Sequence, residues 1–541
     1  MRKSIVSLIA AFAILISGIN HPAFSQKKGM KTINKHDLYT HLSFIASDEL
    51  QGRNTPSKEL KIAARYLASH VAGYGLKPIM PDGSYFQDIP LEITTISESQ
   101  TNLSIISEEN KKVYSFQESF RISSDNEGVY SGEVVFVGGG VNAPDLGWDD
   151  YAGMNIEGKF VIHVDGDLPD NHPINRPENR GYLYNSYMYP RSQGALGIIS
   201  IIDEDRENNL RERGIGFDNP ERGEVIWNED ENNRQGDQPS SDPQRGPYIN
   251  VTIRHSVAAE ILGISENELI GMFEMIRNGH QVPGRELNKT IEIKAGINKR
   301  RGLTRNVVAV IEGSDKKLKD EYIVIGSHYD HVGAREGKVN NGADDDGSGT
   351  VAMLEIAQAL SVERPKRSVI LVWHTGEEKG LWGGHWFVAN SPVPLQNISA
   401  VLQMDMISRN DPDSIYVIGS HFLSSELDEI NNDESDKRKL INLSHYYNDP
   451  NMRRNYHRNS DHYAYHLAGI PTIFYFCGVH EDLHSPTDTI DKCDFDKMEK
   501  VTKFVYAMCY RLGNTKNILE LDTNPEVTSR GVHNLKERIR R

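Results

Sequence analysis

Histidine and acidic side chains recur at the ends of apolar runs between residues 326 and 488 of this chain. The segments that carry them are, in order, GSHYDH, GADDDGSG, HTGEEKG, QMDM and EDLHSPTD. The candidate residues of a metal centre in these segments are His328 and Asp330, Asp345, Glu377 and Glu378, Asp405, and His484. Zinc binds imidazole nitrogen and carboxylate oxygen, and a catalytic zinc site keeps one coordination position free for water. The order and setting of these residues therefore predict a centre that holds two metal ions.

Two more acidic residues have candidate roles beside the metals. Two metal ions ~3.5–4 Å apart need a shared carboxylate between them. Glu377 and Glu378 are adjacent at a strand end, so one can bind metal while the other faces the reacting water. Asp330 follows His328 by two residues and is placed to hold the second nitrogen of that imidazole.

Each motif taken alone has a simpler explanation. A His-x-Asp pair arises by chance, and the Glu-Glu pair is common at the charged start of a helix. The segment DDDGSG could be a solvated acidic turn or a calcium loop, although it lacks the bidentate Glu at the twelfth position of an EF-hand. Only the combination of all five segments in this order carries the functional hypothesis.

Length and composition restrict the class of protein. A chain of 541 residues exceeds one compact core, so two or three domains are expected. Hydrophobic residues at 38% and charged residues at 25% are typical of a soluble globular protein. The formal net charge of -16 opposes binding to phosphate backbones, so we expect no nucleic-acid partner.

The first 25 residues have the pattern of a secretory signal peptide. Arg2 and Lys3 precede an apolar stretch from Ile5 to Ile19, and Ala23-Phe24-Ser25 has the small residues of a cleavage site. The alternative is a membrane anchor, but the stretch is shorter than the ~20 residues that a spanning helix needs. We therefore expect an exported protein, periplasmic or extracellular, without a membrane association after cleavage.

The three cysteines exclude a disulfide framework. Cys477, Cys493 and Cys509 allow one bridge at most, with Cys477–Cys493 as the preferred pair. They also lack the Cys-x-x-Cys spacing of a structural zinc site.

The chain divides into regions of different pattern. Residues 37–72 have helical periodicity, and SYFQDIPLEITTI after them is typical of a strand. The middle region has short β-rich runs and a very polar stretch at 203–245. From about residue 303, apolar strands alternate with helices, which predicts an α/β fold with a mostly parallel central sheet covered by helices on both faces. In such sheets, sites form beyond the carboxyl ends of the strands.

These motifs resemble those of the secreted zinc aminopeptidases with a co-catalytic metal pair. That family also contains glutamate carboxypeptidase, glutaminyl cyclase and the inactive transferrin-receptor ectodomain. The segments HLSFIASDELQGR and YGLKP resemble its amino-terminal helices. The middle region resembles the protease-associated domain often inserted in these enzymes, through GVNAPDLGWDDYAGMNIEGKFVI and RSQGALGIISI. The implied division is a signal peptide 1–25, an amino-terminal part 35–115, an inserted domain 125–280, a main domain 290–515 and a tail 516–541.

The resemblance implies two zinc ions per chain. One would be held by His328, Asp345 and Asp405, and the other by Asp345, Glu378 and His484. Asp345 would bridge them, and the bond between Asp345 and Asp346 would be cis. Glu377 would be the general base, and Asp330, placed to hold the other imidazole nitrogen of His328, is the second candidate catalytic residue.

One departure from the family concerns the oxyanion. Several relatives have Tyr immediately before the final His ligand, whereas this chain has Leu483. Tyr456 and His462 are candidate substitutes.

The leading hypothesis is an aminopeptidase that removes amino-terminal residues from peptide substrates. One alternative is a carboxypeptidase for acidic dipeptides, which would need basic side chains at the pocket. The candidates are Arg409, Arg453, Arg454 and Arg458. A cyclase is disfavoured because it uses a single metal. A non-catalytic receptor is disfavoured because no ligand is lost.

Overall fold

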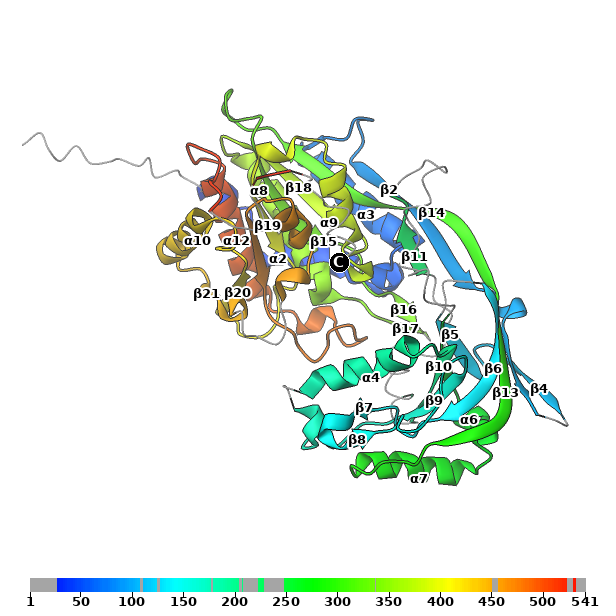
Figure 1. Cartoon of the computed structure of the whole chain (residues 1–541). Coiled ribbons are helices and arrows are strands. Elements are labelled where there is room, and N and C mark those ends of the chain that lie inside the picture. The colour runs from blue at the N-terminus through cyan, green and yellow to red at the C-terminus, as the bar shows by residue number, and fades with distance from the viewer. Residues whose placement is uncertain are drawn as a thin grey trace, which may run out of the picture.

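A computed structural model describes most of the chain after residue 26. The described residues are 27–107, 110–123, 127–176, 179–203, 207, 222–227, 248–335, 337–449, 456–522 and 529–531. They form two lobes, each built on one large sheet (Figure 1). The predicted signal peptide lies outside the described residues. None of the helices in the described part combines the length and the apolar character that a membrane crossing requires.

The larger lobe is built on a ten-stranded sheet within the described residues. Its order is β11-β2-β14-β18-β15-β19-β22-β20-β21, with β1 paired to β14. The strands are β11 (Arg222–Val225), β2 (Phe86–Ile96), β14 (Ile297–Ile311), β18 (Ser368–His374), β15 (Tyr322–His328), β19 (Ile398–Met404), β22 (Thr472–Phe476), β20 (Ser414–Ile418), β21 (Asn442–Ser444) and β1 (Lys77–Pro78). The sequence prediction of an α/β fold with this sheet at its centre is therefore confirmed.

Parallel pairing is concentrated at the centre of this sheet. The strand β15 pairs in parallel with both β18 and β19, and β19 pairs in parallel with β22. Every residue of β18 and β19 is buried, which explains their continuous apolar sequences. The outer strands β2 and β14 pair antiparallel. The carboxyl ends of four neighbouring parallel strands thus meet at one edge.

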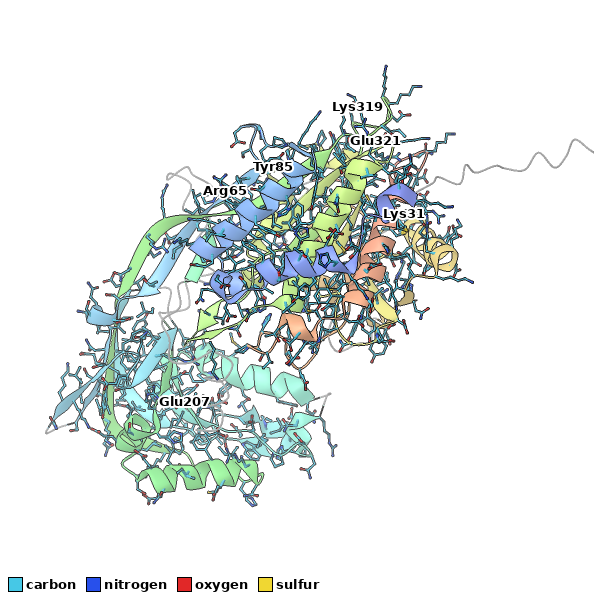
Figure 2. All side chains as sticks on the ribbon, turned by 180° about the vertical axis from the view of Figure 1, so that it is seen from behind. Lys31, Arg65, Tyr85, Glu207, Lys319 and Glu321 are labelled. Carbon is cyan, nitrogen blue, oxygen red and sulfur yellow. The ribbon has the colours of Figure 1, made fainter. Side chains whose placement is uncertain are left out.

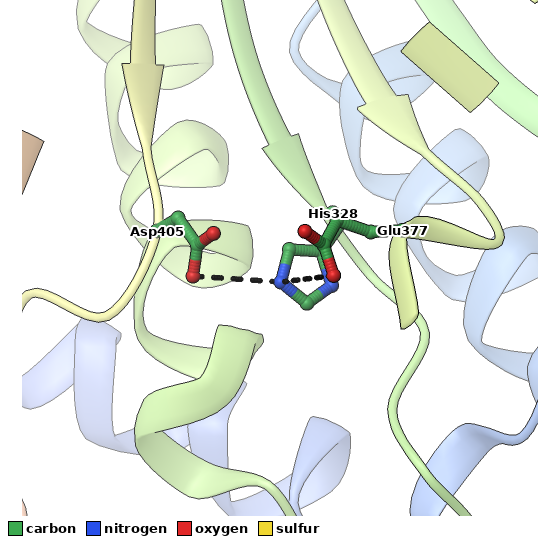
Figure 3. A group of neighbouring side chains, drawn as sticks. All are labelled: His328, Glu377 and Asp405. Carbon is green, nitrogen blue, oxygen red and sulfur yellow. Dashed lines mark ion pairs between the residues drawn. The ribbon is translucent and has the colours of Figure 1, made fainter. Parts of the chain in front are cut away.

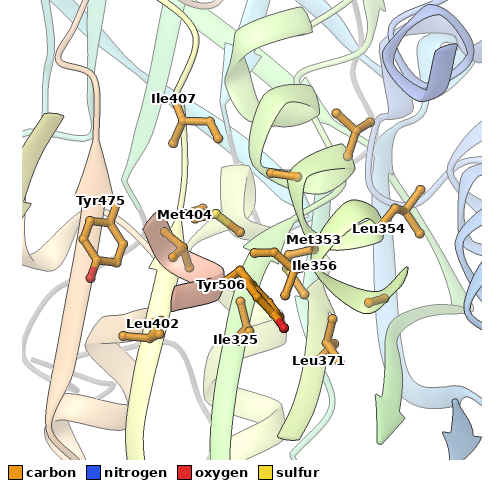
Figure 4. Packing of buried hydrophobic residues seen from close by; sticks show 14 of the residues in the cluster. Ile325, Met353, Leu354, Ile356, Leu371, Leu402, Met404, Ile407, Tyr475 and Tyr506 are labelled. Atoms are coloured by element: carbon orange, nitrogen blue, oxygen red, sulfur yellow. The ribbon is translucent and has the colours of Figure 1, made fainter. Parts of the chain in front are cut away.

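Helices cover both faces of the larger sheet. The lobe's helices are α1 (Lys27–Met30), α2 (Lys35–Ile45), α3 (Lys58–Gly73), α8 (Gly349–Val362), α9 (Trp382–Ala389), α10 (Ser425–Arg438), α11 (His462–Leu467) and α12 (Phe495–Leu512). One face packs against α2, α3, α8 and α12, where Met353, Leu371 and Tyr506 belong to one buried cluster (Figure 4). The other face packs against α9 and α11, through residues such as Val372, Phe387 and Ala464.

Local sequence explains how the amino-terminal helices form. Asn34 caps α2 by accepting hydrogen bonds from the backbone N–H groups of His36 and Asp37. Ser57 caps α3 in the same way through Leu60 N–H, and the apolar face of α3 has the spacing expected of a helix on a core. These helices confirm the helical periodicity of 37–72.

The smaller lobe is built on an eight-stranded sheet of the described residues, with the order β4-β3-β13-β6-β9-β10-β12-β5. The strands are β4 (Lys111–Ser115), β3 (Asn102–Ile106), β13 (Arg285–Ala295), β6 (Gly128–Phe136), β9 (Phe160–Asp165), β10 (Gly197–Ile202), β12 (Ile249–Ile253) and β5 (Phe120–Ser123). Its helices are α4 (Arg180–Ser192), α6 (His255–Leu262) and α7 (Glu266–Arg277). Two small hairpins complete the described structure: β7 (Asn142–Ala143) with β8 (Trp148–Asp149), and β16 (Ala334–Arg335) with β17 (Lys338–Val339).

Adjacent strand ends join the two lobes. The chain leaves the larger lobe after β2 and returns through β13 into β14, and Ser97 N donates to Gly296 O across this junction at 2.8 Å. A second link comes from the polar stretch 203–245, which contributes β11 to the edge of the larger sheet beside β2. Figure 2, from behind, shows Glu207 in the smaller lobe and Arg65, Lys319 and Glu321 in the larger one.

All three cysteines are free thiols in the structure. The Cys477–Cys493 bridge that the sequence allowed is therefore not formed. Instead, the Cys477 thiol is buried and donates to Asp344 Oδ2 at 3.2 Å.

Candidate metal centre

The predicted ligands gather where parallel strands end. His328 is the last residue of β15, and Asp405 directly follows β19. Glu377 and Glu378 follow β18 by three and four residues, and His484 lies in the segment after β22. Because β18, β15, β19 and β22 are neighbours in register, their carboxyl ends bring these five residues to one place. Asp345 reaches the same place from the turn before α8.

One cluster forms around His328. Its Nε2 lies 3.3 Å from Asp345 Oδ1 and 3.4 Å from Asp405 Oδ1. Glu377 Oε2 is farther away, 4.0 Å from the same nitrogen. In Figure 3, dashed lines join the His328 imidazole to both Asp405 and Glu377. The structure therefore brings Glu377 to the cluster and sets it back from the positions of Asp345 and Asp405.

A second cluster forms around Glu378 and His484. His484 Nε2 lies 3.0 Å from Glu378 Oε2 and 3.1 Å from Asp345 Oδ2. His331 joins this cluster, with Nδ1 at 2.9 Å from Glu378 Oε1 and 3.7 Å from Asp345 Oδ2. His331 was missed by the sequence analysis, although it stands in the same GSHYDH segment as His328.

Asp345 lies between the clusters. Its Oδ1 faces His328 and its Oδ2 faces His484. The peptide bond between Asp345 and Asp346 is cis, as the resemblance implied.

The acidic neighbours of Asp345 hold the surrounding backbone. Asp346 accepts hydrogen bonds from the N–H groups of His328 and Met406, next to two candidate ligands. Asp344 accepts from Ser408 N and Oγ, both at 2.7 Å. Asp488, from the segment that carries His484, accepts from the N–H groups of Asp344 and Asp345. These carboxylates fix the loops relative to one another, and the DDD triplet alone gave no indication of this division of roles.

Asp330 lies beside His328, as the sequence analysis expected, and it also contacts Glu377. His328 Nδ1 lies 3.2 Å from the Asp330 backbone carbonyl and 3.7 Å from its carboxylate. The carboxylate also accepts from Glu377 N at 3.2 Å and from Thr55 Oγ1 at 3.0 Å. Asp330 thus orients the Glu377 backbone as well as the His328 ring.

A buried arginine from the amino-terminal segment binds the ligand loops together. Arg53 is fully buried, and its guanidinium donates to four backbone carbonyls. These carbonyls belong to Tyr329, Ile45, Asn341 and Gly342, at 2.6 to 3.0 Å. Two of them flank the ligand-bearing segments, so this guanidinium connects the end of β15 to the turn that carries Asp345.

The site concentrates negative charge away from water. The aspartates described above are at most 5% exposed: Asp330, Asp344, Asp345, Asp346, Asp405 and Asp488. Burial raises the pKa of Glu377 well above its usual value, and the carboxylates of Glu378 and Asp405 add to this effect. Burial opposes charge on His484, but Asp345 and Glu378 outweigh it and raise the His484 pKa to about 11. Buried carboxylates in this number require cations as partners.

The donor set fits metal ions. Two groups of side chains in the described residues bring ligand atoms close enough to hold an ion: His328, Glu377 and Asp405, and His331, Asp345 and Glu378. Ligands ~2.0–2.2 Å from a tetrahedral zinc lie about 3.3–3.5 Å from one another. The separations of 3.3 and 3.4 Å around His328 match that value. Imidazole and carboxylate together suit zinc, cobalt or manganese.

The candidate oxyanion donors have other neighbours. The Tyr456 ring packs on Tyr447 at 4.6 Å between ring centroids. His462 is buried, with Nε2 3.3 Å from His457 Nδ1, and burial lowers its pKa to about 3. His462 is therefore a neutral imidazole within a histidine group.

The structure describes two of the four arginines that the sequence analysis named as candidates for binding acidic substrates. Arg409 donates to Asp482 Oδ2 at 2.6 Å, an ion pair that supports the segment carrying His484. Arg458 lies over the Tyr463 ring at 5.7 Å. Arg453 and Arg454 lie outside the described residues.

The model of one protein family matches part of this chain. Residues 306–509 match the model described as peptidase family M28, and this segment contains all five predicted ligands. This part of the chain is therefore similar to peptidase family M28.

Two curated relatives each match more than a third of the chain. A probable leucine aminopeptidase of Arthroderma otae is 27% identical over 218 residues, which cover 38% of this chain and 57% of that protein. Leucine aminopeptidase 1 of Pyrenophora teres f. teres is 29% identical over 227 residues, covering 38% and 55%. The chain thus spans somewhat more than half the length of these relatives.

Solved structures are similar over nearly the whole chain. An aminopeptidase from Aneurinibacillus sp. strain AM-1 has a TM-score of 0.55 at 18% identity, covering 92% of this chain and 98% of that one. BSAP, a zinc aminopeptidase from Bacillus subtilis, has a TM-score of 0.51 at 14% identity, covering 92% and 99%. These likenesses show that the fold, including its two lobes, is shared.

Proposed function

We propose that this protein is a zinc-dependent exopeptidase that removes amino-terminal residues from peptides. The similarity of residues 306–509 to a peptidase family supports a hydrolase of peptide bonds. The curated relatives with the names of leucine aminopeptidases support the choice of the amino terminus.

The position of Asp345 carries the proposal. Its two carboxylate oxygens face two different imidazoles, His328 at 3.3 Å and His484 at 3.1 Å. A carboxylate with one oxygen toward each of two nitrogen ligands is what a pair of adjacent ions requires. We assign His328, Asp345 and Asp405 to one zinc ion, and Asp345, Glu378 and His484 to the other.

Glu377 is the proposed general base. Two zinc ions held by these residues would supply Lewis acidity for activating the attacking water and for polarising the scissile carbonyl. Glu377 accepts the proton of that water and returns it to the departing amine. Its backbone is held by Asp330, and burial raises the pKa of its carboxyl group well above the usual value, which makes the carboxylate a stronger base.

A panel of substrates tests the direction of attack. Single-residue chromogenic amides with free amino groups should be hydrolysed, whereas acylated dipeptides ending in Glu or Asp should not. A carboxypeptidase for acidic dipeptides would need basic side chains at the pocket. One of the candidate arginines, Arg409, forms an ion pair with Asp482 instead. Hydrolysis of the acylated dipeptides alone would overturn the aminopeptidase proposal in favour of a carboxypeptidase.

The smaller lobe is proposed to restrict access to the site, as an inserted protease-associated domain. The predicted limits 125–280 fall inside its sheet, whose strands extend from Asn102 to Ala295. Replacing residues 98–295 by a short turn uses the junction at Ser97 and Gly296, where the chain ends already lie together. A restrictive lobe predicts faster cleavage of long peptides by the shortened protein. An unchanged length preference would make the lobe a spacer.

Export through a cleaved signal peptide remains a prediction from residues 1–25. Amino-terminal sequencing of the protein secreted by an expression host would test it, with a mature start near residue 26 as the expected result.

A further inference from the structure

His331 has no role in the ligand set that the sequence predicted. It is completely buried, and its imidazole points into the cluster formed by Asp345, Glu378 and His484. The question is whether this side chain orients a ligand or is itself a ligand.

The contact between His331 and Glu378 is close but lacks the geometry of a hydrogen bond. Nδ1 and Oε1 are 2.9 Å apart. Among the described residues, neither ring nitrogen of His331 nor this Glu378 oxygen has a hydrogen-bond partner. Buried polar atoms are normally paired, and an unpaired imidazole in a core is costly. His331 Nδ1 and Glu378 Oε1 are therefore close together without a hydrogen bond between them. We interpret this as two donor atoms that face one common position.

The distances between the donor atoms of this cluster agree with an arrangement around one metal ion. Ligands ~2.0–2.1 Å from one zinc ion are about 2.9 Å apart at a right angle and about 3.6 Å apart at 120°. His331 Nδ1 is 2.9 Å from Glu378 Oε1 and 3.7 Å from Asp345 Oδ2. His484 Nε2 has comparable distances of 3.0 and 3.1 Å to the other oxygen of Glu378 and to Asp345 Oδ2. The two rings lie edge to face, 5.6 Å apart, on either side of the Glu378 carboxylate.

The backbone holds the His331 ring in this position. His331 N donates to Arg53 O at 3.2 Å. A Cβ atom on Gly342 would lie only 2.5 Å from the His331 ring, so the ring packs directly on the start of the turn that carries Asp345. Such fixed placement is typical of a ligand, since a metal site needs its donors oriented before the ion binds.

We propose that His331 is a further ligand of the second metal ion, which is then held by two histidines and two carboxylates. This inference rests on the proposed metal centre and adds His331 Nδ1 to Asp345, Glu378 and His484. The two sites then differ: the His328 site has one imidazole, and the Glu378 site has two.

X-ray absorption at the zinc edge tests the inference on the unaltered protein. Three imidazoles shared by two zinc ions give an average of about 1.5 per ion, whereas two give about 1.0. Two bound zinc ions with an average near 1.5 would support the inference. An average near 1.0 with two ions bound would overturn it and leave the proposed function intact. Absence of bound zinc after reconstitution would overturn the proposed function itself.

The variant His331→Asn separates a ligand from a positioning group. The Asn side-chain amide places a hydrogen-bond donor near the position of Nδ1, so it would preserve an orienting hydrogen bond to Glu378, but it is a poor zinc ligand. We expect binding of the second zinc ion to weaken at least ~10-fold in equilibrium dialysis, with the first ion retained. His41→Asn, which places Asn at a buried histidine in the amino-terminal helices, is the matched control and should keep both ions. Equal zinc affinity of His331→Asn and the natural protein would overturn the inference.

Discussion

Both lobes have parallel strands at the centre of their sheets, but only the larger one gathers metal-binding side chains. In the smaller sheet β9 pairs in parallel with β6 and β10, and β10 with β12, as β15 does with its neighbours in the larger sheet. Both groups of potential metal ligands found among the described residues lie in the larger lobe. Asp165 is the last residue of β9 in the smaller sheet, and it belongs to neither of these groups.

The difference between the lobes shows that the carboxyl ends of parallel strands do not by themselves make a metal-binding site. In the larger lobe, loops from separate parts of the chain are tied together by buried groups. Arg53 joins two loops through four carbonyls, and Asp346 and Asp488 bind backbone N–H groups next to the ligands. A site that holds several donor atoms at fixed separations needs surrounding groups that keep its loops rigid in this way.

The largest expected effect comes from the proposed base. Glu377→Gln should lower kcat by about 10²–10⁴-fold or more, because the amide cannot accept the proton of water. Zinc content should stay unchanged, as Glu377 lies 4.0 Å from His328 Nε2 and outside the assigned ligands.

Asp165→Asn provides the corresponding change at a strand end of the smaller sheet. It should leave kcat within about twofold, because Asp165 belongs to neither group of potential metal ligands. Near-normal activity of Glu377→Gln would show that the base is another residue.

Arg53 should have the next largest effect, on stability and on metal binding together. Arg53→Met leaves four buried carbonyls without their donor, at a cost of roughly 3–5 kcal/mol in the free energy of unfolding. We also expect weaker zinc binding, because the loops after β15 and before α8 are no longer joined.

Thermal unfolding with and without a chelator measures both consequences of Arg53→Met. The stabilisation by zinc should be smaller in the variant than in the natural protein. A variant that loses stability but keeps the full zinc-dependent increase in Tm would show that Arg53 serves the fold and not the metal centre.

A smaller effect is expected at Asp482, which supports the segment carrying His484. Its carboxylate accepts hydrogen bonds from Arg409, Thr487 and Lys492. Asp482→Asn keeps the shape but weakens three bonds, so we expect a loss of about 1–2 kcal/mol and a several-fold weaker second zinc site. Competitive titration with a zinc chelator measures the affinity. A weakened first site with an intact second one would contradict the assignment of His484.

The smallest effect lies far from the metals, at Glu355 in α8. Burial raises the Glu355 pKa to about 8, and its carboxylate accepts from Asn34 N at the start of α2. The folded protein therefore binds a proton here between pH 5 and 8 that the unfolded chain releases, so stability falls as pH rises. Nearby His41, whose pKa burial lowers to about 4, stays neutral over this range.

Glu355→Gln should remove this part of the pH dependence. Relative to the variant, the natural protein should lose on the order of 2–4 kcal/mol in its free energy of unfolding between pH 5 and 8. Denaturant titrations of both proteins at these two pH values give the difference. Parallel pH profiles would mean that Glu355 titrates as an exposed acid.

The strands and the ligands could be predicted because both have characteristic local patterns in the sequence. Apolar runs predicted β15, β18 and β19, and each ends beside a ligand. The helix α10 was missed because its residues are almost all polar, and β11 was missed inside a polar stretch. Strand pairing of β11 with β2 depends on contacts more than 120 residues away, which no local pattern contains.

The supporting residues of the site were missed for a related reason. Arg53, Asp346 and Asp488 act through backbone groups distant in sequence, such as Gly342 for Arg53. His331 was missed because an imidazole directly after an expected supporting residue, Asp330, has no distinguishing spacing. Only the buried position beside Glu378 revealed it.

Anomalous diffraction from crystals of the zinc-loaded protein, measured on both sides of the zinc absorption edge, examines the central claim most directly. The account predicts two peaks less than ~4 Å apart, one on each side of the Asp345 carboxylate. A single peak, or two peaks that do not share Asp345, would contradict it.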